Sequence, residues 1–499
     1  MLKRIALFST LVLVTLAAHA HVQVPALFSD NMVLQQGVPV NVWGWAHEGD
    51  IVAVKFRGRT VTATTRNLKW AVQIRSPRAG GPDTLTISTK EDTLTFTNVL
   101  VGEVWVCSGQ SNMEWPLEKS FQPEEDIASA TNTMIRLFHV SKQKSDSPTT
   151  KIKATWQTCS PQNVKGFSAV GYYFGRDLQA ARKVPVGLIE SDWGGSPAEA
   201  WMSREALETS PRYQAEILDA YPAAEKSYRE ALANWEKEKA EAEKAKQEFK
   251  KWAPWAPWKP SELYSGMIAP LIPYSIKGAI WYQGESNAGR AEQYRSLFAD
   301  MIRCWRRDWK NDFPFFCVQL APFKAIKEQP EDSDWAELRE AQWIATQTVP
   351  NVGMAVITDV GDPKDIHPKR KQPVGARLAL AARAIAYSER IEYSGPTYQR
   401  LQISGEKAVI HFDHIGKGLE ARDGELKGFA ICGEEKKFVW ARAEIVGKTI
   451  VVSSPEVATP IAVRYGWADC PVVNLWNKDG LPASPFRTDN FPMITAGKK

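Results

Sequence analysis

The chain has 499 residues, of which 44% are hydrophobic and 24% are charged, with a formal net charge of +5. This length predicts two or three domains, and the composition is that of a soluble globular protein. The first twenty residues are typical of a secretory signal, because Lys3 and Arg4 precede a mostly apolar stretch and Ala18–Ala20 fits a small-x-small cleavage site. Without Lys3 and Arg4 the net charge falls from +5 to +3, which is too weak to imply nucleic acid or a membrane surface. We expect an exported protein, periplasmic or secreted, with no membrane association beyond export.

Six cysteines are spread along the chain, at positions 107, 159, 304, 317, 432 and 470. An exported protein can form disulfides, but the wide spacing contains no C-x-x-C and indicates neither a zinc ribbon nor a redox pair. Six cysteines allow many pairings, and the sequence does not choose among them. Cys107 lies in an apolar run, so we expect it to be an inert core thiol.

Residues 21–100 alternate short β-type runs with turn residues, and no long helical period appears. The runs are 40–45, 51–56, 70–74, 85–88 and 94–99. This pattern predicts an all-β domain of sandwich or jelly-roll character. Nothing in it marks a binding face, so a structural scaffold is favoured over an independent sugar-binding domain.

Residues 101–390 have a different rhythm, in which apolar runs alternate with helical patterns. The runs are 104–107, 186–189, 276–282, 315–320 and 352–357, and the helical patterns are 170–182, 291–309, 335–349 and 374–387. Buried continuous strands that alternate with helices indicate a parallel sheet covered on both faces. Ligands bind such sheets beyond the carboxyl ends of the strands.

An insertion at 222–260 interrupts this α/β pattern. Its part 222–251 is dense in Glu, Lys and Ala, with opposite charges three residues apart, which favours a solvated helix over a partner-binding one. The prolines of the following W-A-P-W-A-P-W, Trp252–Trp258, cannot continue that helix. This stretch either forms an aromatic flap near a sugar or packs the insertion down.

The C-terminal part returns to short β-type runs separated by glycines over 391–470, which predicts a second β-sandwich domain. Residues 471–499 are rich in Pro and Asn, and we expect them to pack on the body as ordered coil. The predicted architecture is therefore an α/β part between two β-domains.

Residues suited to catalysis follow four of the predicted parallel strands. The carboxyl ends lead into Gly109–Asn112, Ser191–Ser196, Gln283–Asn287 and, through Asp359, Gly361 and Asp362, Asp365–Pro368. A serine, glycines, amides and acids beside a histidine are the components of acyl transfer: nucleophile, oxyanion donors, base and orienting group. Ser111 is the candidate nucleophile. His367 is the best-placed base, and His139 is the fallback.

A cation site is the chemical alternative. Asp359, Asp362, Asp365 and His367 lie close together in the sequence and carry oxygen and nitrogen ligands. No second histidine stands at ligand spacing, so we expect neither a metal nor another cofactor.

Four stretches around these strand ends resemble the sialate O-acetylesterases, within the SGNH (GDSL-like) hydrolases. We call them blocks one to four: G-E-V-W-V-C-S-G-Q-S-N-M-E-W-P-L (102–117), S-D-W-G-G-S-P-A-E-A-W (191–201), G-A-I-W-Y-Q-G-E-S-N (278–287) and D-I-H-P-K-R-K-Q-P-V-G-A-R-L-A (365–379). The N-terminal L-F-S-D-N-M-V-L-Q-Q and the L-R-E-A-Q of Leu338–Gln342 are also similar to that family. The resemblance therefore spans nearly the whole mature chain.

This resemblance implies a three-layer α/β/α SGNH domain with accessory N-terminal and C-terminal β-sandwich domains. It also implies hydrolysis of O-acetyl esters of sugars, typically sialic acid, through an acetyl-enzyme intermediate. Ser111 matches the nucleophile, whose N–H also serves the oxyanion hole, and His367 matches the base. Gly194 or Gly195 matches the oxyanion glycine of block two.

Two departures from the broader SGNH pattern leave roles open. The usual G-x-N-D of block three is here G-E-S-N, so the side-chain oxyanion donor is either Gln283 or Asn287. The usual D-x-x-H is here D-x-H, with Lys364 at the expected acid position. The acid that orients His367 is then one of three: Asp365, the nearest, or Asp362 or Asp359 after a loop turn.

Candidate substrate contacts lie in the same blocks. A sialic acid carboxylate suits a bidentate arginine, so Arg290 and Arg339 are candidates unless they form structural ion pairs. Further candidates are Gln110, Trp193 and Glu285, and the tryptophans at 115, 193, 201 and 281 either stack on a sugar or belong to the core. Acetylated xylan or another plant polysaccharide is the alternative substrate. A non-catalytic exported carbohydrate-binding protein is the alternative of another class, which the intact Ser111 and His367 disfavour.

Overall fold

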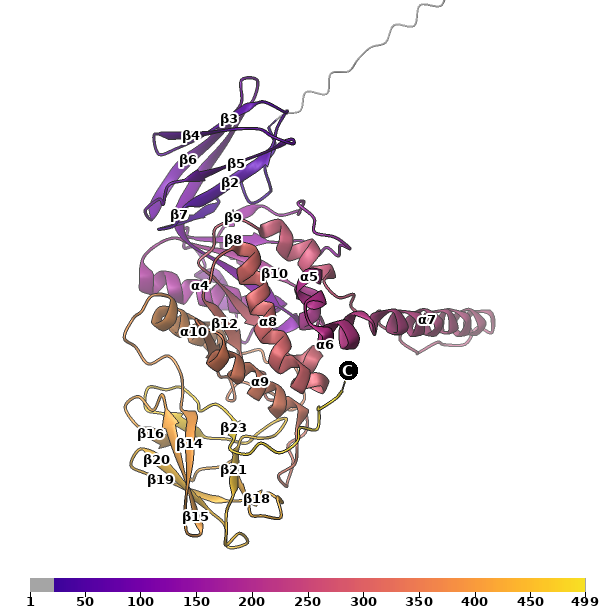
Figure 1. The fold of residues 1–499 in the computed structure, drawn as a ribbon, viewed down its shortest axis with the longest axis vertical. Coiled ribbons are helices and arrows are strands. Elements are labelled where there is room, and N and C mark those ends of the chain that lie inside the picture. Colours follow the sequence, from indigo (N-terminus) through magenta and orange to yellow (C-terminus); the bar gives the residue numbers. More distant parts are fainter. Residues whose placement is uncertain (1–21, 499) are drawn as a thin grey trace, which may run out of the picture.

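The computed structural model of the protein describes residues 22–498, which form three parts arranged along the long axis of the molecule (Figure 1). A β-domain lies at one end, an α/β part in the middle and a second β-domain at the other end. The predicted signal segment lies outside the described residues. No helix between residues 22 and 498 combines the length and the hydropathy that a membrane crossing requires.

The N-terminal part packs two groups of strands around an apolar core. Inward residues such as Val42, Val54 and Ile87 are fully or almost fully buried, while their neighbours along the strands face solvent. This period of two is typical of a sheet with one covered face. The strands are β1 (Val33–Gln35), β2 (Val40–Trp45), β3 (Ile51–Phe56), β4 (Arg59–Thr64), β5 (Lys69–Ile74), β6 (Gly80–Ser88) and β7 (Thr93–Gly109).

Strand β7 belongs to two parts of the molecule. Its first half pairs antiparallel with β6 in the N-terminal part, and its second half is the central strand of the parallel sheet. The predicted boundary between residues 100 and 101 therefore falls inside one continuous strand. This continuity joins the N-terminal part directly to the strand that leads to block one.

The central sheet has the order β13-β12-β11-β7-β10-β8-β9 and is parallel except for β9. Its other strands are β8 (Ile135–His139), β9 (Trp156–Thr158), β10 (Val186–Asp192), β11 (Gly278–Tyr282), β12 (Phe315–Val318) and β13 (Val352–Ala355). Strand β8 was not predicted from the sequence, because the buried Arg136 interrupts its apolar run. The Arg136 guanidinium instead bonds to Asn31 and Asn98 of the N-terminal part.

Helices cover both faces of this sheet, so the predicted three-layer α/β/α fold is confirmed (Figure 1). Along β7, Trp105 and Cys107 share a core with α4 (Ala169–Arg182) and α10 (Gln372–Ala381). Val104 and Val106 point the other way, into the core that holds α8 (Ala291–Trp309) and α9 (Asp334–Thr348). Shorter helices are α1 (Ser111–Glu114), α2 (Glu124–Ala128), α3 (Pro161–Val164), α5 (Arg204–Glu208) and α6 (Pro211–Tyr213).

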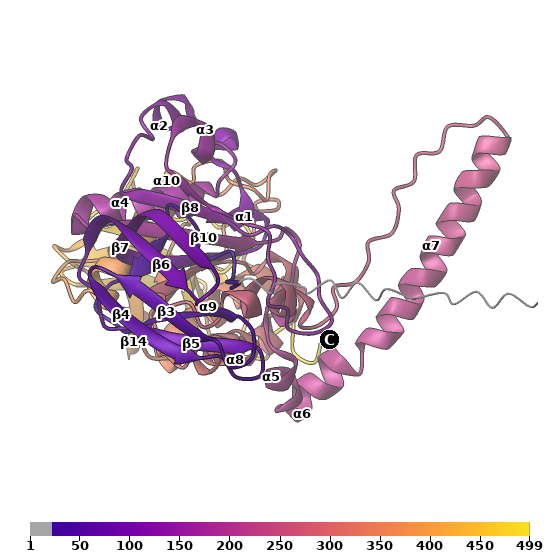
Figure 2. The same cartoon turned by 90° about the horizontal axis from the view of Figure 1, so that it is seen from above.

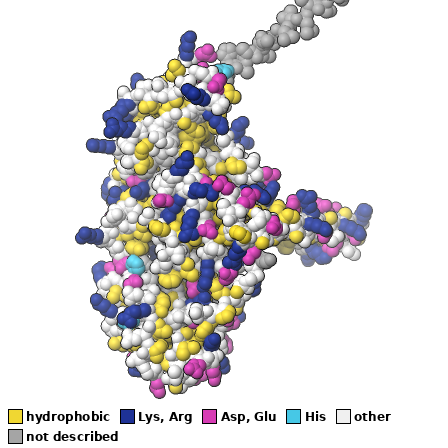
Figure 3. All heavy atoms as spheres, in the orientation of Figure 1, with side chains coloured by type: hydrophobic (Ala, Val, Ile, Leu, Met, Phe, Trp, Pro, Cys, Tyr) yellow, Lys and Arg dark blue, Asp and Glu magenta, His cyan; other side chains and the backbone are white. Residues whose placement is uncertain are grey.

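The insertion forms an arm that projects from the α/β part (Figure 2). Helix α7 (Tyr221–Lys244) has no buried residue, as expected for a solvated helix. Charged side chains of both signs lie along it, and the chain then runs back beside the helix to the body (Figures 2 and 3).

The C-terminal part packs two four-stranded sheets around residues such as Ile410, Ile431 and Val463. Its strands are β14 (Thr397–Ser404), β15 (Lys407–Asp413), β16 (Leu419–Ala421), β17 (Phe429–Cys432), β18 (Val439–Trp440), β19 (Arg442–Val446), β20 (Thr449–Ser453), β21 (Ala462–Tyr465), β22 (Leu475–Asn477) and β23 (Phe486–Arg487). The tail that we predicted as coil thus contributes β22 and β23. Its end packs on α9, since the Glu337 carboxylate accepts bonds from the Ile494 and Thr495 backbone N–H groups.

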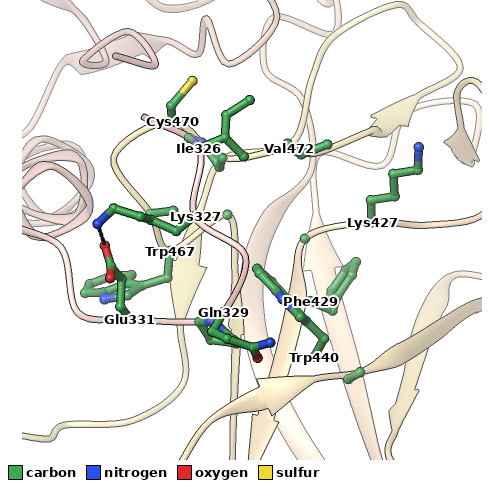
Figure 4. A pocket seen from close by; sticks show the side chains of 16 residues that line it. Ile326, Lys327, Gln329, Glu331, Lys427, Phe429, Trp440, Trp467, Cys470 and Val472 are labelled. Atoms are coloured by element: carbon green, nitrogen blue, oxygen red, sulfur yellow. Dashed lines mark ion pairs between the residues drawn. The ribbon is translucent and has the colours of Figure 1, made fainter. Parts of the chain in front are cut away.

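A cavity of about 300 Å³ lies where the loop 326–331 of the α/β part meets this second sandwich (Figure 4). Phe429, Trp440 and Trp467 form its aromatic wall, and Lys327 pairs with Glu331 at its rim. None of its lining residues belongs to blocks one to four.

The six cysteines are all buried free thiols, and burial raises the pKa of the Cys107 thiol well above its usual value.

Candidate active site

Three parallel strands end at the same level of the sheet. Gly109, the last residue of β7, lies opposite Asp192 of β10 and Tyr282 of β11. Blocks one, two and three leave the sheet at these ends. Segments distant in the sequence therefore meet at the edge where a parallel sheet binds ligands.

A tight approach at Gly109 shapes the turn into α1. Its φ is +144°, and a Cβ atom here would lie 2.2 Å from the carbonyl oxygen of Tyr282. Only glycine fits such a position. The Gln110 N–H then donates to the same carbonyl at 3.0 Å, and Ser111 begins α1 directly afterwards.

Ser111 and His367 lie in direct hydrogen-bond contact. Ser111 Oγ is 2.8 Å from His367 Nε2, although 256 positions separate the two residues. Trp115 of block one stacks on the imidazole, with ring centroids 5.2 Å apart and planes 19° apart. A hydroxyl held on the ring nitrogen of a neutral histidine is the arrangement that activates a serine nucleophile.

Asp365 is the acid nearest to the imidazole. Its Oδ1 accepts a 2.9 Å bond from the His367 backbone N–H and lies 3.6 Å from His367 Nδ1. Burial and then the charge of Lys371 lower the pKa of His367, while Asp365 opposes this shift. The histidine is therefore mainly neutral at neutral pH, the form in which it accepts a proton.

The two other candidate acids have different partners. The Asp359 carboxylate is held by both terminal nitrogens of Arg377, at 2.6 and 2.9 Å. The Asp362 carboxylate accepts the Lys364 backbone N–H. Within residues 22–498, no three or more His, Cys, Asp or Glu side chains are grouped so that they could hold a metal ion.

Gly194 lies against the nucleophile. A Cβ atom at Gly194 would sit 3.2 Å from the Ser111 Cβ, whereas the Cβ position of Gly195 is open and its φ is +76°. The Gly194 N–H donates a 2.6 Å bond to Glu114 Oε2, and Glu114 Oε1 pairs with Lys142 at 2.5 Å. Of the two glycines, it is therefore Gly194 that lies against Ser111, with its N–H bonded to Glu114.

The amides predicted as oxyanion donors brace the surrounding loops instead. Gln283 Nε2 donates to Asn287 Oδ1 at 2.6 Å and to the Ser196 carbonyl at 3.3 Å. Asn287 Nδ2 donates to Glu199 Oε2 at 3.0 Å. Gln283 Oε1 also accepts the Tyr294 hydroxyl, and among the described residues neither amide has a hydrogen bond to Ser111.

Gln110 joins blocks one and three. Its Oε1 accepts 3.3 Å bonds from the Gly284 and Ser286 N–H groups, and only 3% of the residue is exposed. With the carbonyl oxygen fixed in this way, the other end of the side chain, the Nε2 amide, is the donor beside the nucleophile turn. Gln110 therefore remains a candidate for contact with substrate.

A buried polar network lies behind the serine–histidine pair. Asn112 Nδ2 donates to Glu285 Oε1 at 2.6 Å and to the Ile366 carbonyl at 3.1 Å, and Lys371 Nζ donates to Asn112 Oδ1. Burial lowers the pKa of Lys371 to about 7 and raises the pKa of Glu285. Glu285, predicted to contact substrate, thus has one carboxylate oxygen hydrogen-bonded within this network.

The arginines predicted to bind a substrate carboxylate have protein partners. Arg339 is fully buried, and its guanidinium donates to the backbone carbonyls of Leu320, Ala321, Ala468 and Asp469. The predicted substrate contact of Arg339 is therefore wrong, and the residue fastens the α/β part to the C-terminal part. Arg290 forms a 2.6 Å ion pair with Glu199.

The candidate tryptophans divide into two groups. Trp201 and Trp281 are fully buried core residues, whereas Trp115 and Trp193 are half-buried and border the site. The fallback base His139 ends β8, where its Nδ1 lies 3.4 Å from Glu190 Oε2. It therefore takes no part in the Ser111–His367 pair.

Sequence reasoning missed three contributors: Glu114, Asn112 and Lys371. Glu114 and Asn112 lie within block one and Lys371 within block four, so their positions were available. Their hydrogen-bond partners could not be read from the sequence, because Asn112 and Lys371 are 259 positions apart. A signal in the sequence was the lysine itself, close behind the histidine in D-I-H-P-K-R-K.

Comparison with known proteins identifies the family. A family model described as carbohydrate esterase, sialic acid-specific acetylesterase, matches residues 101–251 and 245–384. The crystal structure of a carbohydrate acetylesterase from Xanthomonas citri matches with a TM-score of 0.82 and 39% identity, covering 94% of this chain and 100% of that chain. Sialate O-acetylesterases of Homo sapiens and Pongo abelii are 27% and 28% identical over 510 and 512 residues, covering 92% of this chain and 91% of theirs. The chain therefore belongs to this family of carbohydrate esterases, as blocks one to four predict, and is an esterase that removes O-acetyl groups from sugars.

Proposed function

We propose that the protein removes these groups by a serine mechanism in which Ser111 is the nucleophile and His367 the general base. The observation that supports this best is the 2.8 Å contact between Ser111 Oγ and His367 Nε2. His367 takes the hydroxyl proton as Oγ attacks the acetyl carbonyl, and the sugar oxygen leaves with that proton. Water, deprotonated by His367, then attacks the acetyl-serine ester, which releases acetate and restores Ser111.

Backbone N–H groups are the proposed donors to the oxyanion. The Ser111 N–H is the first amide of α1 and has no acceptor within the helix, and Gly194 lies against Ser111. Glu114 holds the Gly194 N–H in this structure and has to yield it, at least in part, as the oxyanion forms. Asp365 orients His367 in this proposal.

Acetate release from an aryl acetate tests the mechanism. We expect Ser111→Ala to lower turnover by about 10⁴-fold or more, and to abolish labelling by a fluorophosphonate probe. Ser129→Ala, which alters an exposed serine at the end of α2, is the matched control and should keep both. Wild-type turnover by purified Ser111→Ala protein would refute the proposal. Release of acetate by the wild-type protein would also dispose of the non-catalytic alternative.

Two classes of acetylated sugar fit this reaction. The names of the curated relatives favour O-acetylated sialic acid. One structural observation favours a sugar without a carboxylate, such as acetylated xylan or another plant polysaccharide: Arg339 is bonded to backbone carbonyls and Arg290 to Glu199. Both predicted arginines already have protein partners, so we favour the neutral polysaccharide. Comparing kcat/KM for O-acetylated sialic acid and for acetylated xylan decides between them.

We also propose that the protein acts after export, in the periplasm or outside the cell. The support is the basic, apolar and small-residue pattern of residues 1–20. Mass spectrometry of the mature protein from the native host tests this proposal. A first residue at or near His21 is expected, and an intact Met1 would contradict it.

A further inference from the structure

The return segment of the arm exposes two tryptophans to an unusual degree. Trp252 and Trp255 each have 93% of their surface exposed. They lie on the chain that runs back from the tip of α7 toward the body (Figure 2). Large aromatic rings are seldom left so exposed without a binding role, because their burial is strongly favourable.

The sequence favours an arrangement of these rings on one side of the segment. Pro254 and Pro257 restrict their own φ, and each disfavours a helical conformation in the alanine before it, so the prolines of W-A-P-W-A-P-W favour an extended path with three residues per turn. Exposure has the same period, since both prolines are half-buried while Trp252 and Trp255 are exposed. One turn of this path rises by about 9 Å, so the two rings stand in a row at roughly the length of a disaccharide in an extended glycan chain.

The row is held in place by α7. The Trp235 indole N–H donates to the Lys251 carbonyl at 2.8 Å, and its ring packs edge-on against Phe249 at 5.6 Å. Lys251 also pairs with Glu238 across the arm at 2.7 Å. Trp235 of α7 and Phe249 therefore anchor the start of the row, and Trp252 and Trp255 remain exposed to a ligand.

The row leads to block two. Trp258, the third tryptophan of the repeat, packs edge-on against Trp193 with centroids 5.4 Å apart. Lys144 lies over the Trp258 ring at 4.2 Å. Trp193 is the neighbour of Gly194, which lies against Ser111. An aromatic path thus runs from the exposed arm to the edge of the candidate active site.

We propose that Trp252 and Trp255 form a docking ladder for the extended chain of an acetylated polysaccharide and guide it toward Ser111. The inference rests on the proposed function and deepens it, because it assigns the substrate to polymers and not to single sugars. Indole faces stack on the C–H faces of pyranose rings, and rings spaced along one line suit a ligand that repeats along one line. Trp258 and Trp193 continue this line into the catalytic part.

The charge of the arm favours a glycan over a membrane. Residues 222–251 carry eight basic and seven acidic side chains, so the arm has little attraction for anionic lipids. The sequence neighbours of the two tryptophans are Lys251, Ala253, Pro254 and Ala256, so no large aliphatic side chain adjoins them to insert into a lipid layer. A lipid surface and a second copy of the chain are outcomes that the experiment separates.

The test uses the full-length protein in a Ser111→Ala background, so that binding is measured without deacetylation. Trp252→Ala/Trp255→Ala removes both rings. Trp255→Ala/Ala256→Trp is the matched control. It keeps two exposed indoles but moves one of them to another side of the segment, out of line with Trp252. Affinity electrophoresis in gels with acetylated xylan or acetylated mannan measures the binding constant.

We expect both variants to bind at least one of the two polymers more weakly, the double alanine variant by about tenfold. In the catalytically intact background, kcat/KM for that polymer should fall by the same factor, with turnover of the aryl acetate unchanged. Equal retention of all variants in both gels would overturn the proposal. The proposal would also be overturned if the variants bound both polymers like the parent protein but lost binding to phosphatidylglycerol vesicles. The same holds if they lost a dimer that the parent protein forms in sedimentation. Failure of the serine mechanism is a separate outcome, because the Ser111→Ala protein would then still release acetate.

Discussion

Lys371 Nζ donates a hydrogen bond to Asn112 Oδ1, which ties block four to the residue next to the nucleophile. Lys371 is almost fully buried, and its ammonium group also lies over the rings of Trp115 and Tyr282. Burial lowers its pKa to about 7, so it is mostly charged below neutral pH. In that range its charge disfavours a second positive charge on the nearby His367 and keeps the base neutral.

Removal of this charge should shift the pH profile. Lys371→Gln keeps a donor for Asn112 but carries no charge, so the pKa of His367 should rise. A smaller fraction of His367 is then neutral at a given acidic pH, and the acidic limb of kcat/KM for an aryl acetate should move to higher pH. Lys369→Gln, at an exposed site two residues away, is the control. An acidic limb that stays in place in Lys371→Gln would refute the electrostatic role.

Asp365 should matter less than the acid of a fully buried triad. Its carboxylate is 3.6 Å from His367 Nδ1, and its side chain is 43% exposed, so solvent competes for the interaction. We expect Asp365→Asn to lower kcat by about 10- to 100-fold, below the ~10⁴-fold loss known for a buried triad aspartate. Asp362→Asn should leave kcat unchanged, because that carboxylate bonds to the Lys364 backbone. A larger loss in Asp362→Asn than in Asp365→Asn would reverse the assignment.

Features encoded by a single local pattern could be predicted from the sequence. The apolar run before Ser111 contributes side chains to the cores on both faces of the sheet, and Gly109 marks the turn that follows. The strand and the candidate nucleophile could therefore both be located. The pairing with His367 followed from the rule that parallel strands end at one edge. These features depend on residue types at short spacing.

Roles that depend on long-range partners could not be predicted from the sequence. The Arg339 guanidinium could bind a substrate carboxylate, but it is hydrogen-bonded to four carbonyls from two distant segments. No spacing rule reveals these partners. Gln283 and Asn287 have the right chemistry for an oxyanion hole and are instead bonded to each other. Strand β23 has only two residues and pairs with β21, so its alternation is too short to detect.

Gly194 and Gly195 should respond differently to alanine. A Cβ at 194 would lie 3.2 Å from the Ser111 Cβ and 3.3 Å from Glu114 Oε2, so the nucleophile or its neighbours must shift. We expect Gly194→Ala to lower kcat for an aryl acetate by about 10- to 100-fold, since small displacements of reacting groups are costly. In Gly195→Ala the Cβ meets open space, and its φ of +76° costs ~1 kcal/mol of stability with little effect on kcat. Equal kcat losses in both would contradict the placement of Gly194 beside Ser111.

Arg339 should be required for stability and not for substrate recognition. Its buried guanidinium satisfies the carbonyls of Leu320 and Ala321 in the α/β part and of Ala468 and Asp469 in the C-terminal part. Arg339→Met removes the donor to the Leu320 and Ala468 carbonyls, whereas Ala321 keeps the Trp335 indole N–H and Asp469 keeps the Phe323 N–H. We expect a loss of about 3 kcal/mol or more in the free energy of unfolding. Urea denaturation measures this loss, and KM for O-acetylated sialic acid and for acetylated xylan should remain near the wild-type values in the folded protein. Arg290→Met is the comparison, because that side chain is partly exposed near block three. A selective rise of KM for the sialic acid in Arg339→Met, with unfolding unchanged, would restore the arginine to a role in substrate binding.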